Sequence, residues 1–289
     1  MAIYSMTGFG RGEAESDSYT VTVEIKSVNH RFKDARFKMS SLFNSIELDL
    51  KKQLFKKVKR GSLDIYINFK RAEARSKFEE IDSEKVKDFI EKMESILPGK
   101  ELNIQPGEFL RNEFLVDQDL SKDQALLDLT KDAFSKALET LIESRLSEGQ
   151  KLSKVIEDHK FLYLESFNKV NGLTEEFQKH VEGKLRKRFE DYKSEIKVDE
   201  PRFMQEVVFY LEKMDVHEEI NRVKSHIEKL DEILTKGGET GRQIDFLIQE
   251  LNRETNTIGS KSSMQDISDN VVQMKVQLEK MREQGLNLE

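Results

Sequence analysis

The residues between 215 and 226 have the types and spacing of a site that could do chemistry. Acidic, basic and imidazole side chains recur there at intervals of about three or four residues: Asp215, Glu218, Glu219, Arg222 and His226. In a helix this spacing places most of them on one side. Carboxylates and an imidazole on one side can hold Mg²⁺ or Mn²⁺, which can activate water beside a phosphate. Arg222 could bind that phosphate through its planar guanidinium group.

The alternative for 215–226 is an ordinary solvated surface. Long helices commonly carry a charged face on which an arginine pairs with a carboxylate. Spacing alone allows both interpretations.

A second polar stretch, 239–262, follows a Gly237-Gly238 turn that favours antiparallel packing of two helices. Its apolar stripe consists of Ile244, Leu247, Ile248 and Leu251. Another side of this helix carries side chains that donate or accept hydrogen bonds: Arg242, Asp245, Gln249, Asn252 and Asn256. We expect this side to approach the 215–226 face or to contact another chain. Glu250 and Glu254 form an i, i+4 pair on a different side. We expect this pair, with Arg253, to contact a neighbouring subunit rather than to share an ion with Asp245.

A third polar cluster, Asn29-His30-Arg31, follows an alternating segment at 19–28. His30 has the ordinary pKa range of a general acid or base. Four basic residues of the N-terminal part, one of them in this cluster, could form a rim that binds RNA phosphates: Arg11, Arg31, Lys59 and Arg60. The alternative is a structural turn with no role in chemistry.

Composition narrows the classes of protein that this chain can belong to. It has 289 residues and no cysteine, which excludes disulfides, thiolate metal sites and cysteine nucleophiles. A net charge of −7 argues against indiscriminate phosphate binding, so any RNA contact needs a local basic surface. We find no P-loop, dinucleotide-binding, zinc-protease or serine-hydrolase motif. No apolar run spans a membrane or forms a signal peptide, and we expect a soluble, cytoplasmic protein with no membrane contact.

The elements that must position these residues fall into two kinds. Strands are predicted at 3–11, 19–28, 32–39 and 63–69, with a helix at 42–58, which gives a β-β-β-α-β module. Helices are predicted at 81–97, 123–149, 151–196, 202–236, 239–259 and 264–285, and the one at 151–196 bends near Asn171-Gly172 to form a hairpin arm. The predicted fold class is α+β, a small N-terminal sheet-plus-helix module followed by a long, mainly helical region. The predicted parts are 1–120, 121–200 and 201–289.

Several motifs, in order along almost the whole chain, resemble those of the YicC/YloC family of bacterial proteins. They include S-M-T-G-F-G-R-G at 5–12, V-E-I-K-S-V-N-H-R-F at 23–32, E-E-I-N-R-V-K-S-H at 218–226 and G-R-Q-I-D-F-L-I-Q-E-L-N-R-E-T-N-T-I-G-S-K-S at 241–262. The resemblance implies an endoribonuclease that uses a divalent metal and assembles as a ring-like hexamer. It favours function over a plain surface for Glu219, Arg222 and His226.

We therefore predict a metal-dependent endoribonuclease, a hydrolase of RNA phosphodiester bonds. The predicted catalytic residues are His226, Glu219, Arg222 and His30, and the predicted ligands of Mg²⁺ or Mn²⁺ are Glu218, Glu219 and His226. The predicted RNA contacts are Arg11, Asn29, Arg31, Arg60, Arg242, Asn252 and Arg253.

Three alternatives stay open at this point. A metal-free mechanism would use His30 or His226 to deprotonate the ribose 2′-hydroxyl. A non-catalytic adaptor would bind RNA and present it to other nucleases. A structural helical oligomer would have no role with RNA at all.

Overall fold

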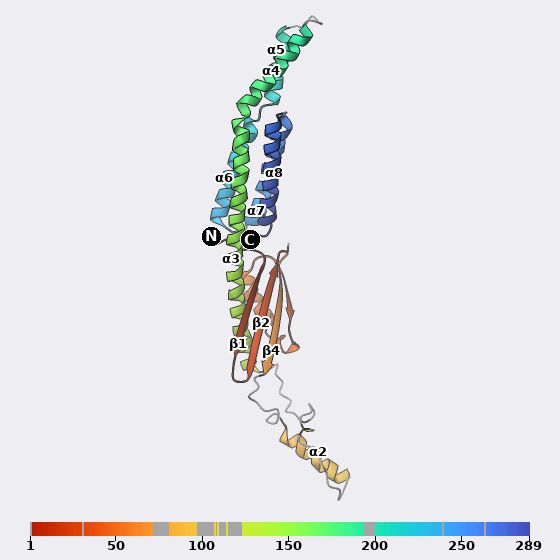
Figure 1. Cartoon of the computed structure of the whole chain (residues 1–289). Coiled ribbons are helices and arrows are strands. Elements are labelled where there is room, and N and C mark those ends of the chain that lie inside the picture. The colour runs from red at the N-terminus through yellow and green to blue at the C-terminus, as the bar shows by residue number, and fades with distance from the viewer. Residues whose placement is uncertain are drawn as a thin grey trace. The chain divides into compact units, whose positions relative to one another are not determined.

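The computed structural model in Figure 1 describes residues 2–30, 32–71, 81–96, 107, 109, 114, 123–193, 200–238, 240–262 and 264–289. It confirms the predicted class, a small N-terminal sheet with helix cover followed by a mainly helical region. The chain forms two compact units. The sheet unit comprises Gly8–Ser144, and the helical unit comprises Met1–Thr7 with Arg145–Glu289. This division differs from the three predicted parts, because one long helix contributes to both units and the first seven residues join the second.

The sheet unit contains strands β1 (Gly8–Glu15), β2 (Tyr19–Val28), β3 (Asp34–Lys38) and β4 (Ser62–Arg71) in the order β1-β2-β4-β3. β2 pairs antiparallel with β1 and β4, whereas β3 runs parallel to β4. A parallel pair needs a crossover connection, and the chain between β3 and β4 supplies it with the short helix η1 (Ser41–Phe43) and helix α1 (Glu47–Lys57). The predicted β-β-β-α-β order is confirmed. Helix α2 (Ser83–Ile96) also belongs to this part of the chain.

Alternation of side chains explains the core of the sheet unit. Val21, Val23 and Ile25 on β2 are fully buried, and Ile65 and Ile67 on β4 lie opposite the last two of them. Their neighbours in the sequence point to the other face of the sheet. The buried face packs with apolar residues of α1 and of the first turns of helix α3 (Gln124–Gly172) in one cluster.

Helix α3 (Gln124–Gly172) is continuous where we expected a break near residue 150. Gly149 stands inside it, and a Cβ atom there would lie 2.4 Å from the carbonyl oxygen of Ile3. This glycine therefore permits a close backbone approach and does not end the helix. The predicted bend at Asn171-Gly172 is confirmed, because α3 ends at Gly172 and α4 (Thr174–Lys193) begins two residues later.

The predicted single helix at 202–236 is wrong, because it is two helices. α5 (Glu200–Lys213) ends before Met214, and α6 (His217–Lys236) begins after Val216. Between them the carboxylate of Asp215 accepts a hydrogen bond from the backbone N–H of His217, at 3.1 Å. Aspartate competes with helical backbone bonding in this way and favours helix starts.

The helical unit has its core between α6, α7 (Thr240–Lys261) and α8 (Gln265–Gly285). Gly237 and Gly238, with φ of 65° and 100°, reverse the chain between α6 and α7. Val223, Ile227 and Leu230 of α6 join the apolar stripe of α7 in one buried cluster. In the part of the chain that the structure describes, no helix is long and apolar enough to cross a membrane.

The first and last residues of the chain pair within the helical unit. Ser5 and Leu288 form an antiparallel bridge. The N–H of Met6 donates to the carbonyl of Asn287 at 2.8 Å, and the N–H of Glu289 donates to that of Tyr4 at 2.8 Å. Arg145 donates to the carbonyl of Ser5 at 2.6 Å and forms a buried ion pair with Glu289.

Candidate functional site

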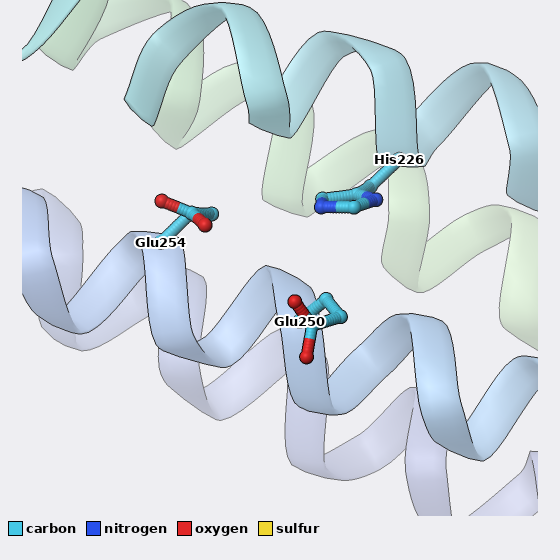
Figure 2. Close-up of side chains that lie close together, drawn as sticks. All are labelled: His226, Glu250 and Glu254. Atoms are coloured by element: carbon cyan, nitrogen blue, oxygen red, sulfur yellow. The ribbon is translucent and has the colours of Figure 1, made fainter. Parts of the chain in front are cut away.

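Three side chains of the helical unit form a group that could hold a metal ion. His226 points from α6 toward Glu250 and Glu254, which stand one turn apart on α7 (Figure 2). One potential ligand atom from each of the three lies within 4.8 Å of the others. We call this group the His-Glu-Glu cluster.

Burial makes the His-Glu-Glu cluster chemically unusual. Glu254 is only 3% exposed. The Nδ1 atom of His226 is buried and has no hydrogen-bond partner among the described residues. An orphaned buried polar atom costs about 1–3 kcal/mol, so such atoms usually have a function or a missing partner. A divalent cation would fit here, because it would take a lone pair from the imidazole and offset the repulsion between two nearby carboxylates.

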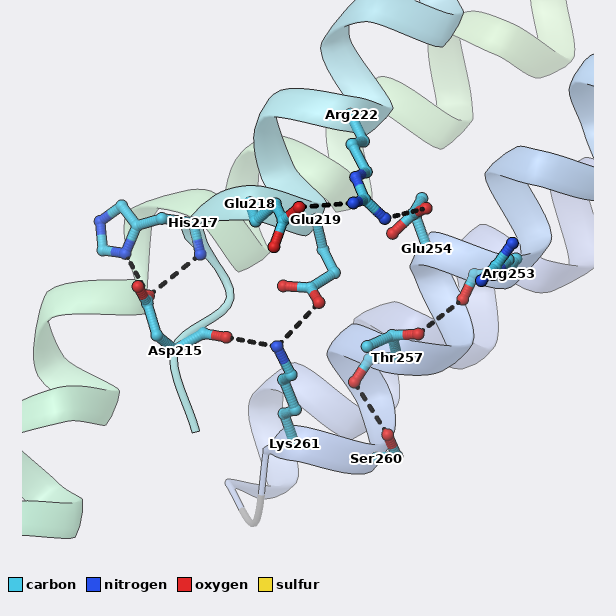
Figure 3. A network of polar contacts seen from close by, with 10 residues as sticks. All are labelled: Asp215, His217, Glu218, Glu219, Arg222, Arg253, Glu254, Thr257, Ser260 and Lys261. Atoms are coloured by element: carbon cyan, nitrogen blue, oxygen red, sulfur yellow. Dashed lines mark hydrogen bonds and ion pairs between the residues drawn. The ribbon is translucent and has the colours of Figure 1, made fainter. Parts of the chain in front are cut away.

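Arg222 of α6 borders the cluster, and Figure 3 shows its guanidinium between Glu218 and Glu254. Its guanidinium donates to Glu254 at 3.3 Å and also pairs with Glu218. The hydrogen bond to Glu254, followed by the charge of Glu218, raises the pKa of Arg222 above its ordinary value. The arginine therefore stays charged while half of its side chain faces solvent, where a phosphate could reach it.

Glu219 has a different partner. It is 6% exposed, and its Oε1 atom accepts from the Nζ of Lys261 at 2.7 Å. The same ammonium donates to the backbone carbonyl of Asp215 at 2.7 Å (Figure 3). Lys261 thus ties the last turn of α7 to the start of α6.

The predicted metal ligands separate in the structure. His226 lies in the His-Glu-Glu cluster, but Glu219 pairs with Lys261 and Glu218 pairs with Arg222 on the surface. All three lie on α6, but His226 follows Glu219 by seven residues, which is about 10 Å along the helix axis and too far for one ion.

The side of α7 that approaches α6 also differs from our expectation. Asp245 accepts from Arg282 of α8 at 3.0 Å and from Gln249 at 2.8 Å. Glu250 and Glu254, which we expected to face another subunit, stand opposite His226 instead. The sequence did contain a signal for this pairing, because His226 and Glu250 lie twelve residues before and after Gly238. In an antiparallel pair centred on that turn, such residues come side by side.

The remaining predicted residues fall into two groups. Asn252 and Arg253 are exposed on α7, and Arg242 is exposed near its start. Four others belong to the sheet unit: Arg11, Asn29, His30 and Arg60. Arg11, Asn29 and His30 are exposed, and Arg60 is partly buried with an Nε atom that has no hydrogen-bond partner in the described structure. Arg31 lies outside the described residues.

His30 is held by its own loop. Its Nδ1 accepts a hydrogen bond from the backbone N–H of Phe32 at 3.2 Å, and the two rings lie 6.0 Å apart. The same Nδ1 also lies 3.2 Å from the backbone carbonyl oxygen of Phe32, so the loop can hold the ring in either tautomer.

Comparison with known proteins gives a consistent result over the full length. The family model "Endoribonuclease YicC-like, N-terminal region" matches residues 3–154, and "Endoribonuclease YicC-like, C-terminal" matches residues 170–289. A protein of Clostridioides difficile (strain 630) named "Probable endoribonuclease YicC" is 36% identical over an alignment 299 positions long, which covers 100% of both chains. A protein of the same name from Haemophilus influenzae is 32% identical over 289 residues, covering 99% of this chain and 100% of its own.

Proposed function

Because this chain belongs to the family of YicC-like endoribonucleases, we propose that it cleaves RNA internally with the assistance of a divalent metal. The observation that supports this proposal is the His-Glu-Glu cluster, in which ligand atoms of one imidazole and two carboxylates lie within 4.8 Å of one another. The buried Nδ1 of the same imidazole has no hydrogen-bond partner among the described residues. Ordinary helix surfaces do not bury such groups without compensation.

His226, Glu250 and Glu254 would hold the ion, and their mixture of imidazole and carboxylate suits Mn²⁺ or Mg²⁺. A divalent ion bound there supplies Lewis-acid stabilisation of a phosphate and a more acidic water molecule.

The neighbouring residues have distinct roles in this proposal. Arg222 orients Glu254 through their hydrogen bond and offers its exposed side to a phosphate oxygen. Glu219 is a positioning residue, since its ion pair with Lys261 holds α6 against α7 and so fixes the distance between His226 and the two glutamates. His30 and the basic residues of the sheet unit stay predicted contacts of RNA.

The proposed assembly is a ring-like hexamer and the proposed compartment is the cytoplasm. The assembly rests on the family resemblance, and the compartment rests on the sequence-based expectation of a protein without a signal peptide or membrane span. Sedimentation of the purified chain tests the assembly, and a mass of one or two chains would contradict it.

The deciding experiment compares three single substitutions in the full chain. His226→Ala and Glu250→Gln should each reduce the cleavage rate of a defined single-stranded RNA by at least about 100-fold, since even outer-shell changes at metal sites cost about 10–100-fold. Glu165→Gln is the matched control, because Glu165 is an exposed glutamate on α3. The same proteins titrated with MnCl₂ in a calorimeter give a readout independent of activity, and the first two should lose the binding heat.

Product ends separate the metal mechanism from the metal-free one. Attack by water leaves no 2′,3′-cyclic phosphate, whereas attack by the ribose 2′-hydroxyl does. Cyclic ends, together with loss of cleavage in His30→Ala and full activity in Glu250→Gln, would contradict the proposal.

A further inference from the structure

A second feature of the α6–α7 hairpin lies between the His-Glu-Glu cluster and the glycine turn. It is a cavity of about 620 Å³ whose lining includes Lys229, Glu232, Lys236, Arg242, Gln243 and Phe246. We call it the hairpin pocket. All of its residues belong to the helical unit.

The hairpin pocket is locally basic in an acidic chain. Three cationic side chains and one carboxylate line it, whereas the whole chain has a net charge of −7. The carboxylate of Glu232 is already neutralised by Lys236 at 2.8 Å, and this hydrogen bond lowers the pKa of Glu232. Across the described ranges, no ion pair involves Lys229 or Arg242. The pocket therefore has positive charge left for an anion.

An aromatic ring stands beside these cations. Phe246 is 60% exposed, although it follows Arg242 by one helical turn and lines the pocket. A single exposed phenylalanine needs no explanation. In this basic pocket the exposed ring of Phe246 is accompanied by the guanidinium of Arg242 and the amide of Gln243. Proteins hold an unpaired nucleotide in a similar way, by stacking its base on an aromatic ring and pairing its phosphate with a cation.

The pocket continues the surface on which the cluster lies. Phe246 precedes Glu250 by four residues on α7, and Lys229 follows His226 by three on α6. These spacings place each pair on one helix face, about 6 Å or less apart along the axis. A nucleotide in the pocket would thus be close to a phosphodiester at the cluster.

We propose that the hairpin pocket is a nucleotide subsite for single-stranded RNA. Phe246 stacks on one base, and Arg242 and Lys229 bind the adjoining phosphate, so the pocket determines which bond lies at the His-Glu-Glu cluster. This inference rests on the proposed function for the identity of the polymer. A duplex would not serve, because its bases are already stacked on one another.

The test measures RNA binding without cleavage. In a His226→Ala background, the affinity for a labelled single-stranded RNA is measured by fluorescence anisotropy. Adding Phe246→Ala should weaken binding about tenfold, as expected for loss of one stacked base. The matched control is Phe161→Ala, because Phe161 on α3 is 62% exposed and lies outside the pocket. Adding Arg242→Ala should lower the slope of log affinity against log salt by about 0.7, the value for one single-strand phosphate contact.

The outcomes separate this inference from the proposed function. If Phe246→Ala binds RNA as tightly as the background protein, or if the background protein binds no RNA, the subsite does not exist. If Phe246→Ala leaves RNA affinity intact but changes the sedimenting mass, the pocket is a contact between copies of the chain. Weakened binding in Phe246→Ala supports the subsite even if the chain with His226 intact cuts nothing, a result that would overturn only the proposed function.

Discussion

The two units of this molecule treat charge in opposite ways. In the helical unit four charged side chains are buried: Arg145, Glu219, Glu254 and Glu289. Among the described residues of the sheet unit, the polar side chains that are buried to the same degree are Ser27 and Thr130, which carry no charge. The sheet unit keeps its ion pairs at the surface, as between Arg36 and Asp34 at 3.3 Å.

This contrast supports the proposed place of the site in the helical unit. A buried charge costs several kcal/mol unless it is paired and hydrogen-bonded, and apolar residues of equal volume are often better for stability. The sheet unit avoids this free-energy cost, because the charged side chains of ion pairs such as Arg36–Asp34 are exposed. In the helical unit, the buried Glu219 pairs with Lys261 and the buried Glu254 pairs with Arg222, and both pairs connect α6 with α7.

The largest effect should come from breaking a buried pair. Arg145→Ala removes the guanidinium that pairs with Glu289 and donates to Ser5, and should lower the free energy of unfolding by about 3–5 kcal/mol. Arg36→Ala, which removes the exposed pair of the sheet unit, should cost about 0.5 kcal/mol or less. Urea titration of both variants measures the difference. Equal losses would abolish the contrast between the units.

A smaller effect, of opposite sign in the two units, should follow from adding a methyl group to a glycine. A Cβ atom at Gly10 of β1 would lie 2.1 Å from the carbonyl oxygen of Ala137, so Gly10→Ala should destabilise by about 1–3 kcal/mol. Gly183, inside α4, has nothing within 4 Å of that position. Gly183→Ala should therefore stabilise by up to about 1 kcal/mol through helix propensity. Thermal unfolding of the two variants measures whether each substitution raises or lowers stability. A stabilised Gly10→Ala would show that the sheet is packed less closely against α3 than the 2.1 Å approach indicates.

The smallest effect concerns the turn before α6 and depends on pH. Burial acts to raise the pKa of Asp215, but hydrogen bonds from His217 outweigh it and hold that pKa below 3.8. Its stabilisation is therefore present above the pKa of the unfolded chain and is lost as the pH falls through the lower folded value. The side chain is 45% exposed, so solvent screening limits the loss in Asp215→Asn at pH 7 to about 0.5 kcal/mol or less. The stability deficit of Asp215→Asn should shrink as the pH falls through the lowered pKa of Asp215. A deficit that stays constant with pH would mean that the charge contributes nothing.

Sequence reasoning predicted the elements whose signals are local. The alternation at Val21, Val23 and Ile25 indicated β2, and Gly237-Gly238 indicated the turn between α6 and α7. The predictions were wrong where contacts with distant segments determine where a helix ends. Gly149 resembles a helix end, but Ile3 packs against it. Asp215 fits a helical face, but its side chain bonds the backbone of His217 instead.

The candidate site shows the same limit. His226 was predicted as a ligand from residues on its own helix, because spacing along one segment is visible in a sequence. Glu250 and Glu254 come from the facing helix, and their place opposite His226 depends on the register of the α6–α7 pair. Counting residues from Gly238 would have found that register, whereas assigning faces within α7 alone did not.

The bridge between Ser5 and Leu288 has a consequence for synthesis. At about 5–20 residues per second, a ribosome needs roughly 15–60 s to make 289 residues. During that time residues 8–144, which form the sheet unit, are made well before Leu288. The bridge can form only after Leu288 has been translated, so the segment around Ser5 lacks this partner while the residues between them are made.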